Sequence, residues 1–262
     1  MRDCKVSENG NTLRNVSDPK WISDVEFEAL SGLSLPENEV HLWRIDLEAV
    51  AAGEPRWRGL LSADEKARAD RFHFVRDRQN FTATRALLRT LLGAYIGCQP
   101  ARVHFAYADR HKPALDPSQG AAPVQFNVSH SGSRALLAFA RGRTLGVDVE
   151  QIRNNFDHEA LARRFFSPAE QDALAGFPAS ERCSAFFRCW TRKEAYIKAH
   201  GAGLSLPLSE FDVSLMPAEQ NALLTTRPDG GEAALWSLRE VQAGEGYEAA
   251  LCVRGNGWIL RM

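Results

Sequence analysis

Two acidic residues in one short stretch of this sequence have the spacing of side chains that point the same way. In "LGVDVEQI", Asp148 and Glu150 are two positions apart, so in a β-strand both project from one face. Neighbouring carboxylates repel each other, and either water or a cation can relieve the repulsion. Oxygen ligands with no Cys or His beside them favour a hard cation such as Mg²⁺. The stretch therefore indicates either an exposed acidic strand face or one wall of a metal site.

A second stretch places an acid and an amine on one face of a helix. In "WTRKEAYIKAHG", Trp190, Glu194 and Lys198 recur every four residues, about one helical turn apart. Solvated helices often pair Glu with Lys in this register, for a gain of only about 0.2–0.5 kcal/mol. If this face meets the acidic strand instead, Glu194 becomes a third carboxylate and Lys198 an adjacent cation. Such a site suits a phosphate-rich ligand, since Mg²⁺ commonly shares its coordination with phosphate oxygens. Trp190 is expected in the core or as an anchor of the helix, rather than as a catalytic residue.

Basic and polar residues that could hold an anion are spread over the first half of the sequence. They are Lys66, Arg68, Arg71, Arg85, Arg89, Lys112 and the pair Ser129 and His130 in "FNVSHS". Most such side chains are simply solvated, and a histidine after a strand is more often structural than a ligand contact. Together they supply the positive partners that an anionic ligand needs.

Bulk properties narrow the class of protein. The chain has 262 residues, a formal net charge of −1, 44% hydrophobic residues and 25% charged residues, as in an ordinary globular protein. This charge balance argues against nucleic acid or an anionic membrane as partner. We find neither an apolar stretch of the roughly 20 residues that span a bilayer nor the apolar core of a secretory signal. Five scattered cysteines without zinc-site spacing favour a reduced, cytoplasmic protein.

The elements that must position these residues follow from periodicity and capping signals. Ser62 with Glu65, and Ser167 with Glu170, form capping boxes that predict helices starting at Ala63 and at Pro168. The first of these helices is expected to run toward His73. Further helices are expected over residues 76–96, 156–166 and 180–200, and strands over residues 40–47, 125–131, 134–141 and 145–152. Residues 103–115 have a strand-like start and a turn-rich end. The residues after the last helix are expected to form four antiparallel strands at 211–215, 234–241, 247–254 and 257–262. The order of helices and strands along the whole chain predicts an α+β fold.

The joint order of these motifs resembles one family, the Sfp-type 4′-phosphopantetheinyl transferases. "FNVSHS", then "LGVDVE", then "WTRKEAYIKAHGAGL" carry the resemblance, together with "LSADEKARADRF", "HKP", "RRFFSPAE" and "GLSLPL". It extends from about Val40 to the C-terminus. It implies a monomer of two similar pseudo-symmetric halves, each a small antiparallel sheet packed with a long helix. We expect an extended or partly disordered leader over residues 1–35, a half with CoA nucleotide contacts over 36–143, and a half with the metal and catalytic site over 144–262.

The resemblance also implies an activity. Members move the 4′-phosphopantetheine arm of coenzyme A (CoA) onto a serine of an apo acyl or peptidyl carrier protein of fatty-acid, polyketide or peptide synthesis, releasing adenosine 3′,5′-bisphosphate. By resemblance, Asp148, Glu150 and Glu194 bind Mg²⁺ or Mn²⁺. Glu194 also serves as general base, and Lys198 neutralises charge that develops on the diphosphate.

Contacts to CoA are implied for five further residues, and the sequence departs from the family at two places nearby. The implied contacts are Arg68, Arg85, Lys112, Ser129 and His130. Arg110 and His111 precede Lys112 where glycine is usual, and Glu65 stands where some members carry a basic residue.

Two other functions use the same residues. A magnesium-dependent hydrolase would cut a diphosphate with water and would release nucleotide from CoA without any carrier protein. A non-catalytic module that binds CoA or a carrier protein would be free to lose Asp148, Glu150, Glu194 and Lys198, and their presence argues against it.

Overall fold

The computed structural model describes residues 30, 32–51, 53–107, 113–119 and 124–262. The expectations for most of the leader, and those for Arg110, His111 and Lys112, lie outside the described residues. Of the helices in the described ranges, none combines the length and apolarity that crossing a bilayer requires.

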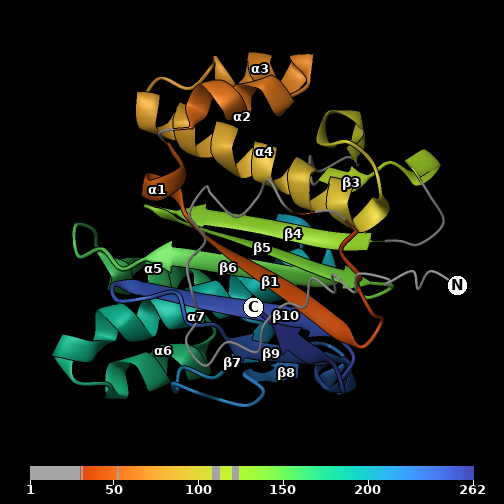
Figure 1. Cartoon of the computed structure of the whole chain (residues 1–262). Coiled ribbons are helices and arrows are strands. Elements are labelled where there is room, and N and C mark those ends of the chain that lie inside the picture. Colours follow the sequence, from red (N-terminus) through yellow and green to blue (C-terminus); the bar gives the residue numbers. More distant parts are fainter. Residues whose placement is uncertain (1–29, 31, 52, 108–112, 120–123) are drawn as a thin grey trace, which may run out of the picture.

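Two small sheets, each packed with one long helix, make up most of the molecule (Figure 1). The first sheet has the order β11-β1-β5-β4 and comprises β1 (Glu39–Asp46), β4 (Val124–Ser131), β5 (Arg134–Arg141) and β11 (Ile259–Arg261). The second has the order β6-β10-β9 and comprises β6 (Leu145–Gln151), β9 (Trp236–Glu240) and β10 (Tyr247–Arg254). The long helices are α4 (Val75–Ile96) on the first sheet and α7 (Ala179–His200) on the second. This arrangement confirms the predicted α+β class.

Shorter elements surround this framework. Two-stranded ribbons pair β2 (Phe105–Tyr107) with β3 (Pro113–Leu115) and β7 (Phe211–Val213) with β8 (Leu223–Thr226). The remaining α-helices are α1 (Leu47–Ala51), α2 (Glu54–Leu60), α3 (Ala63–Ala69), α5 (His158–Phe165) and α6 (Pro168–Gly176). Both predicted capping boxes are present, at the starts of α3 and α6.

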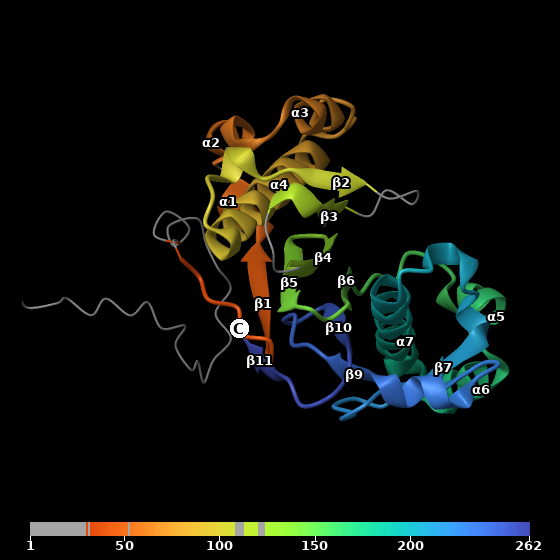
Figure 2. The ribbon, with the colours of Figure 1, turned by 90° about the vertical axis from the view of Figure 1, so that its right-hand side faces the viewer.

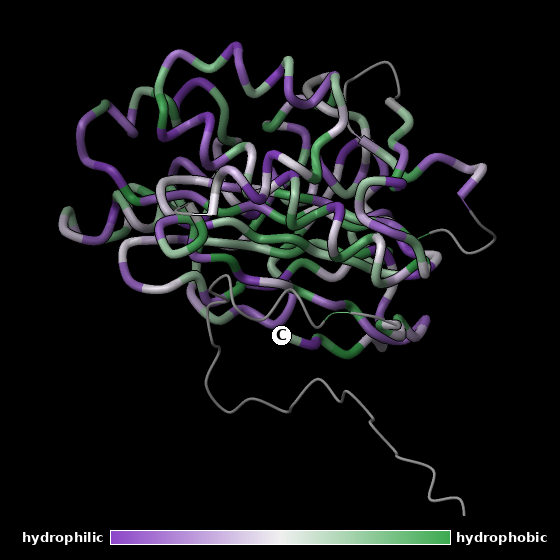
Figure 3. The backbone as a smooth tube through the Cα atoms, turned by 45° about the horizontal axis from the view of Figure 1, so that its top comes forward, coloured by the Kyte–Doolittle hydropathy of each residue, from purple (hydrophilic) through white to green (hydrophobic). Residues whose placement is uncertain are grey.

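Three hydrophobic clusters hold these layers together. One lies between α4 and the first sheet, and a second surrounds α7. A third joins the two sheets directly, because alternate residues of β5 and β6, such as Leu136, Val147 and Val149, point away from the helices and are fully buried. Figure 3 shows the most hydrophobic stretches of backbone running along the central strands. The sheets therefore form the middle of the molecule and the long helices its outer layers.

The edge strands β4 and β6 lie side by side where the two sheets meet (Figure 2). They are linked by polar side chains of β4 that accept backbone N–H groups of β6. We call this contact the β4–β6 seam, defined by Asn127, Ser129 and Ser131 on one side and residues 147–151 on the other. It joins the part of the chain before residue 142 to the part after it.

Several elements differ from the sequence predictions. The prediction of four antiparallel C-terminal strands was wrong, because β11 instead pairs in parallel with β1 and so extends the first sheet. The helix that starts at Ala63 ends at Ala69 rather than near His73, and α4 begins soon afterwards. Helices α1 and α2 and strands β3 and β8 were not predicted, since each is too short for its periodicity to be read.

Candidate active site

A polar pocket of about 410 Å³ lies where β4, β6 and α7 meet. Its lining residues are Val128, Ser129, His130, Asp148, Glu150, Trp190, Glu194 and Lys198. The structure thus brings together six of the predicted site residues from three separate stretches of sequence. Trp190 lines the pocket, and its ring also packs against Phe165 and Phe186.

The acidic face of β6 reaches α7 because the strand lies very close to the helix. Val147 and Val149 are fully buried between the sheets, which turns Asp148 and Glu150 toward the other side. Gly146 makes the close approach possible, since a Cβ there would overlap the backbone of Ala195 and Ala199. The glycine of the "GVDVE" motif therefore sets the distance between the two acids and the helix that carries Glu194.

Asp148 is the most enclosed of the three acids, with 3% of its surface exposed. Its Oδ1 accepts hydrogen bonds from Lys198 Nζ at 2.6 Å and from Ser129 Oγ at 2.8 Å. Its Oδ2 is buried and has no hydrogen-bond partner among the described residues. A buried carboxylate oxygen without a partner is costly and needs compensation, which a bound cation would supply.

The other two acids are held in an environment that disfavours their charge. Burial raises the pKa of Glu150, and the nearby Asp148 carboxylate raises it further. Burial likewise raises the pKa of Glu194, with added repulsion from Asp148 and Glu150. A divalent cation among these oxygens would offset both effects.

The donor set fits a hard divalent cation in its chemistry. All three acids offer oxygen ligands, and one buried oxygen of Asp148 lacks a partner. Within the described ranges, however, no three His, Cys, Asp or Glu side chains are already arranged around one point as a metal site. Lys198 lies against Asp148 in this arrangement, so the amine neutralises part of the acidic cluster.

The β4 side of the pocket holds Ser129 and His130. The imidazole of His130 is exposed on this side, yet protein atoms surround it closely enough that burial lowers its pKa. The positive charges of Lys198 and Arg68 lower this pKa further, while Asp77 raises it. The Arg68 guanidinium lies over the ring of Phe81 at 5.2 Å from the ring centroid. Arg68 therefore acts electrostatically on the same region as His130, although it does not line the pocket.

Arg85 lies elsewhere, in a buried ion cluster. Its Nε is 2.9 Å from the carboxylate of Glu65, and Arg89 Nε is 2.6 Å from the same carboxylate. The Arg85 guanidinium also lies over the ring of Phe105, 4.4 Å from its centroid. Glu65 accepts the backbone N–H of Ser62 as well, so this departure from the family pattern has a structural explanation. A contact from Arg85 to CoA stays a prediction.

Sequence reasoning missed two residues that organise the site. Lys193 is fully buried, 2.7 Å from Glu170, and donates hydrogen bonds to the carbonyl oxygens of Leu208 and Phe211. It fixes α7 against its neighbours and lies on a different face of the helix from Glu194. Ser131 donates a hydrogen bond to Glu150 Oε2 at 2.7 Å. Its signal was the polar residue at every second position of β4, at Asn127, Ser129 and Ser131.

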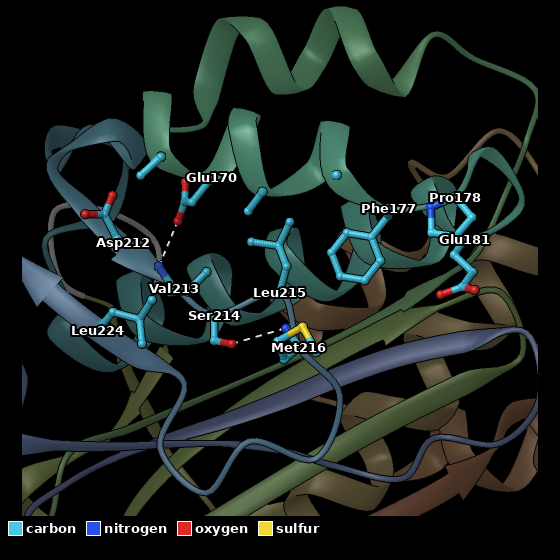
Figure 4. A pocket seen from close by; sticks show the side chains of 13 residues that line it. Glu170, Phe177, Pro178, Glu181, Asp212, Val213, Ser214, Leu215, Met216 and Leu224 are labelled. Carbon is cyan, nitrogen blue, oxygen red and sulfur yellow. Dashed lines mark hydrogen bonds between the residues drawn. The ribbon is translucent and has the colours of Figure 1, made fainter.

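A larger, mostly apolar cavity of about 610 Å³ lies between α6, β7 and β8 (Figure 4). Phe177, Leu215, Met216 and Leu224 line it. Three acidic residues, Glu170, Glu181 and Asp212, also line it, and the carboxylate of Glu170 accepts the backbone N–H of Val213 at 2.8 Å. It shares no lining residue with the polar pocket. Judged by volume alone, this cavity would be the first candidate for a ligand site. The smaller pocket, however, combines three acids with the amine of Lys198, and this combination could act on a phosphate.

Comparison with known proteins agrees with this geometry. Residues 144–252 match the model of the 4′-phosphopantetheinyl transferase superfamily, and residues 55–141 match that of the 4′-phosphopantetheinyl transferase N-terminal region. The 4′-phosphopantetheinyl transferase HetI of Nostoc sp. is 42% identical over 226 residues, which cover 86% of this chain and 92% of HetI. The chain belongs to the 4′-phosphopantetheinyl transferase superfamily.

More distant relatives of the same superfamily also match. A putative 4′-phosphopantetheinyl transferase of Synechocystis sp. is 33% identical, with 78% of this chain and 79% of the relative covered. The 4′-phosphopantetheinyl transferase Sfp of Bacillus subtilis is 28% identical, with 75% of this chain and 84% of Sfp covered. The resemblance drawn from the motifs is confirmed, and with it the prediction of a transferase.

Proposed function

We propose that this transferase moves the 4′-phosphopantetheine arm of CoA onto a serine of an apo acyl or peptidyl carrier protein, with Mg²⁺ as cofactor and adenosine 3′,5′-bisphosphate as product. The observation that carries the proposal is the convergence of Asp148, Glu150, Glu194 and Lys198 on one pocket that also holds Ser129 and His130. Acids for a cation, and an amine and hydrogen-bond donors for phosphates, then line the same space.

The chemical step joins the serine oxygen of the carrier to the phosphorus that bears pantetheine. The bond from that phosphorus to the bridging oxygen of the diphosphate breaks, and adenosine 3′,5′-bisphosphate departs with the electron pair. Glu194 takes the serine proton, directly or through water. Glu194 lines the same pocket as the other acids, where a bound serine hydroxyl could reach it. The carrier supplies the nucleophile, so this chain needs no activated serine of its own.

The other charged and polar residues of the pocket would stabilise the negative charge on the phosphates of CoA. Asp148, Glu150 and Glu194 would hold Mg²⁺, which when bound withdraws negative charge from the diphosphate oxygens. Lys198 reaches into the same pocket, and its amine can neutralise charge on the departing phosphate. Ser129, His130 and Arg68 provide hydrogen bonds and positive charge for the nucleotide end of CoA, and Lys112 is proposed to add to them.

The proposed halves of the enzyme, residues 36–143 and 144–262, meet at this pocket. Ser129 and His130 come from the first half, and the acids and Lys198 come from the second. β11 joins the first sheet, so the second half also contributes a strand to the sheet of the first half. We propose a monomer that acts in the cytoplasm, in keeping with the free thiols of Cys98, Cys183, Cys189 and Cys252.

His130→Ala tests the division between binding and chemistry. The variant is expected to raise KM for CoA more than it lowers kcat, because His130 contributes to holding the nucleotide rather than to proton transfer. Steady-state kinetics with varied CoA and a saturating apo carrier measure both constants. A large loss in kcat with unchanged CoA affinity would contradict this role.

The activity itself is tested by intact-mass analysis of apo acyl and peptidyl carriers incubated with the enzyme, CoA and Mg²⁺. We expect the mass of at least one carrier to increase by the phosphopantetheine arm, and the increase to disappear when its acceptor serine is replaced by alanine. Chelation of the metal is expected to stop the reaction. Release of nucleotide from CoA without any carrier, and no modified carrier, would identify a hydrolase instead.

A further inference from the structure

The β4–β6 seam is built on a repeated pattern of side-chain hydrogen bonds. Asn127 Oδ1 accepts a hydrogen bond from the backbone N–H of Val147 at 2.9 Å. Ser129 Oγ accepts one from the backbone N–H of Val149 at 3.4 Å. Ser131 Oγ accepts one from the backbone N–H of Gln151 at 3.1 Å. These acceptors occupy every second position of β4, so all three face the same way. They stand in for the backbone carbonyl groups that would join two strands within one sheet.

The two serines of the seam also bind the acids of the pocket. Ser129 Oγ donates to Asp148 Oδ1 at 2.8 Å, and Ser131 Oγ donates to Glu150 Oε2 at 2.7 Å. A hydroxyl group has one proton and two lone pairs. Because each hydroxyl already accepts a backbone N–H, its single proton is directed at the carboxylate. The orientation of these bonds is therefore set by the seam itself.

The same pattern leaves one carboxylate oxygen of each acid for another partner. With Oδ1 of Asp148 engaged by Ser129 and Lys198, Oδ2 is buried and has no hydrogen-bond partner among the described residues. With Oε2 of Glu150 engaged by Ser131, Oε1 is the oxygen available to a cation. Hydrogen bonds of this kind orient metal-binding carboxylates and affect metal affinity strongly.

We propose that Ser131 is a positioning residue that holds the Glu150 carboxylate in the orientation required to bind the divalent cation. The inference rests on the proposed function, which assigns Glu150 to the metal. Ser131 is the informative member of the pair because it does not line the pocket, whereas Ser129 does and also accepts a hydrogen bond from Lys198. The acid of the pocket that Ser131 hydrogen-bonds is Glu150.

Asn127 offers a matched control within the same seam. It accepts a backbone N–H just as Ser131 does, but the residue of β6 at the equivalent place is Gly146, which has no carboxylate to hold. Asn127→Ala and Ser131→Ala each remove one side-chain acceptor from the seam. Only Ser131→Ala also removes a donor to an acid of the pocket. A purely structural role of the seam would make the two variants equivalent.

The test is Mn²⁺ binding, followed by the electron paramagnetic resonance signal of free Mn²⁺, with CoA present and carrier protein absent. Ser131→Ala is expected to raise the Mn²⁺ dissociation constant by about 10-fold or more. Asn127→Ala should leave it close to wild type, and Ser131→Thr, which keeps the hydroxyl, should restore most of the affinity. Circular dichroism and thermal unfolding confirm that each variant is folded before the titration.

Two results would overturn the inference while leaving the proposed function intact. Ser131→Ala could bind Mn²⁺ as wild type does, or Asn127→Ala could weaken binding as much as Ser131→Ala. If wild-type protein itself binds no Mn²⁺, the proposed metal site fails, and the role of Ser131 fails with it.

Discussion

Glu194→Gln is expected to lower kcat for phosphopantetheine transfer by roughly 10²–10⁴-fold, the usual contribution of a general base, while CoA binding largely survives. The amide has the shape of the carboxylate but cannot accept the serine proton, and it is a poorer ligand for Mg²⁺. Transfer should therefore also depend less steeply on Mg²⁺ concentration. Kinetics with an apo carrier measure kcat, and isothermal titration with CoA measures binding.

The matched control for this variant is Glu181→Gln, which makes the same change in the first turn of α7, outside the polar pocket. It should leave kcat unchanged. Near-normal transfer by Glu194→Gln, or loss of CoA affinity at unchanged kcat, would contradict the role of Glu194 as base. Equal losses of kcat in Glu194→Gln and His130→Ala, with normal CoA affinity, would contradict the assignment of both residues.

Gly146→Ala is expected to cause a large loss of both stability and activity. The added Cβ would overlap backbone atoms of Ala195 and Ala199 and the Cβ of Lys198, and a helix backbone cannot move aside as the tip of a flexible side chain can. Overpacking of this kind typically costs about 1–3 kcal/mol in the free energy of unfolding. Moving α7 away from β6 also separates Glu194 and Lys198 from Asp148, so kcat/KM should fall further than the folded fraction does.

Urea unfolding and steady-state kinetics on the same preparation measure the two losses. Gly59→Ala provides the control, because Gly59 lies inside α2 and a Cβ there would meet nothing within 4 Å. Alanine is favoured over glycine within a helix, so this variant should be at least as stable as wild type. A Gly146→Ala protein with normal stability and transfer would show that the close contact of β6 and α7 is not required.

The polar pocket lies where the β4–β6 seam joins two parts of the chain, and each part supplies only some of its lining residues. β4 presents Ser129 and His130, while β6 and α7 present the acids and Lys198. The β4–β6 seam fixes these two sets relative to each other through side chains rather than through a shared backbone ladder. Substitutions at seam residues that do not line the pocket, such as Ser131, can therefore alter the pocket indirectly.

Local sequence signals predicted the elements that carry the site. The capping boxes at Ser62 and Ser167 located the starts of α3 and α6, and helical periodicity located α4 and α7 within one residue at either end. Alternation in "LGVDVEQI" placed Asp148 and Glu150 on one strand face. These features depend on residues close together in the chain, for which capping and periodicity are informative.

Features that depend on distant partners could not be predicted in the same way. The parallel pairing of β11 with β1 joins residues more than 200 positions apart, and alternation within a strand does not specify its neighbour. The burial of Glu65 with Arg85 and Arg89 depends on how α3 packs on α4. That Glu194 meets the acids of β6 followed only from the family resemblance, because the spacing within α7 is equally compatible with a solvated face.

The most direct measurement is a crystal structure of the protein with CoA and Mn²⁺, in which anomalous scattering locates the cation. We predict a single strong peak in the polar pocket, bound by carboxylate oxygens of Asp148, Glu150 and Glu194 and by the CoA diphosphate. Lys198 should then have turned from Asp148 toward the phosphates. A cation bound to the diphosphate without these carboxylates, or a CoA molecule seated outside the pocket, would contradict the account.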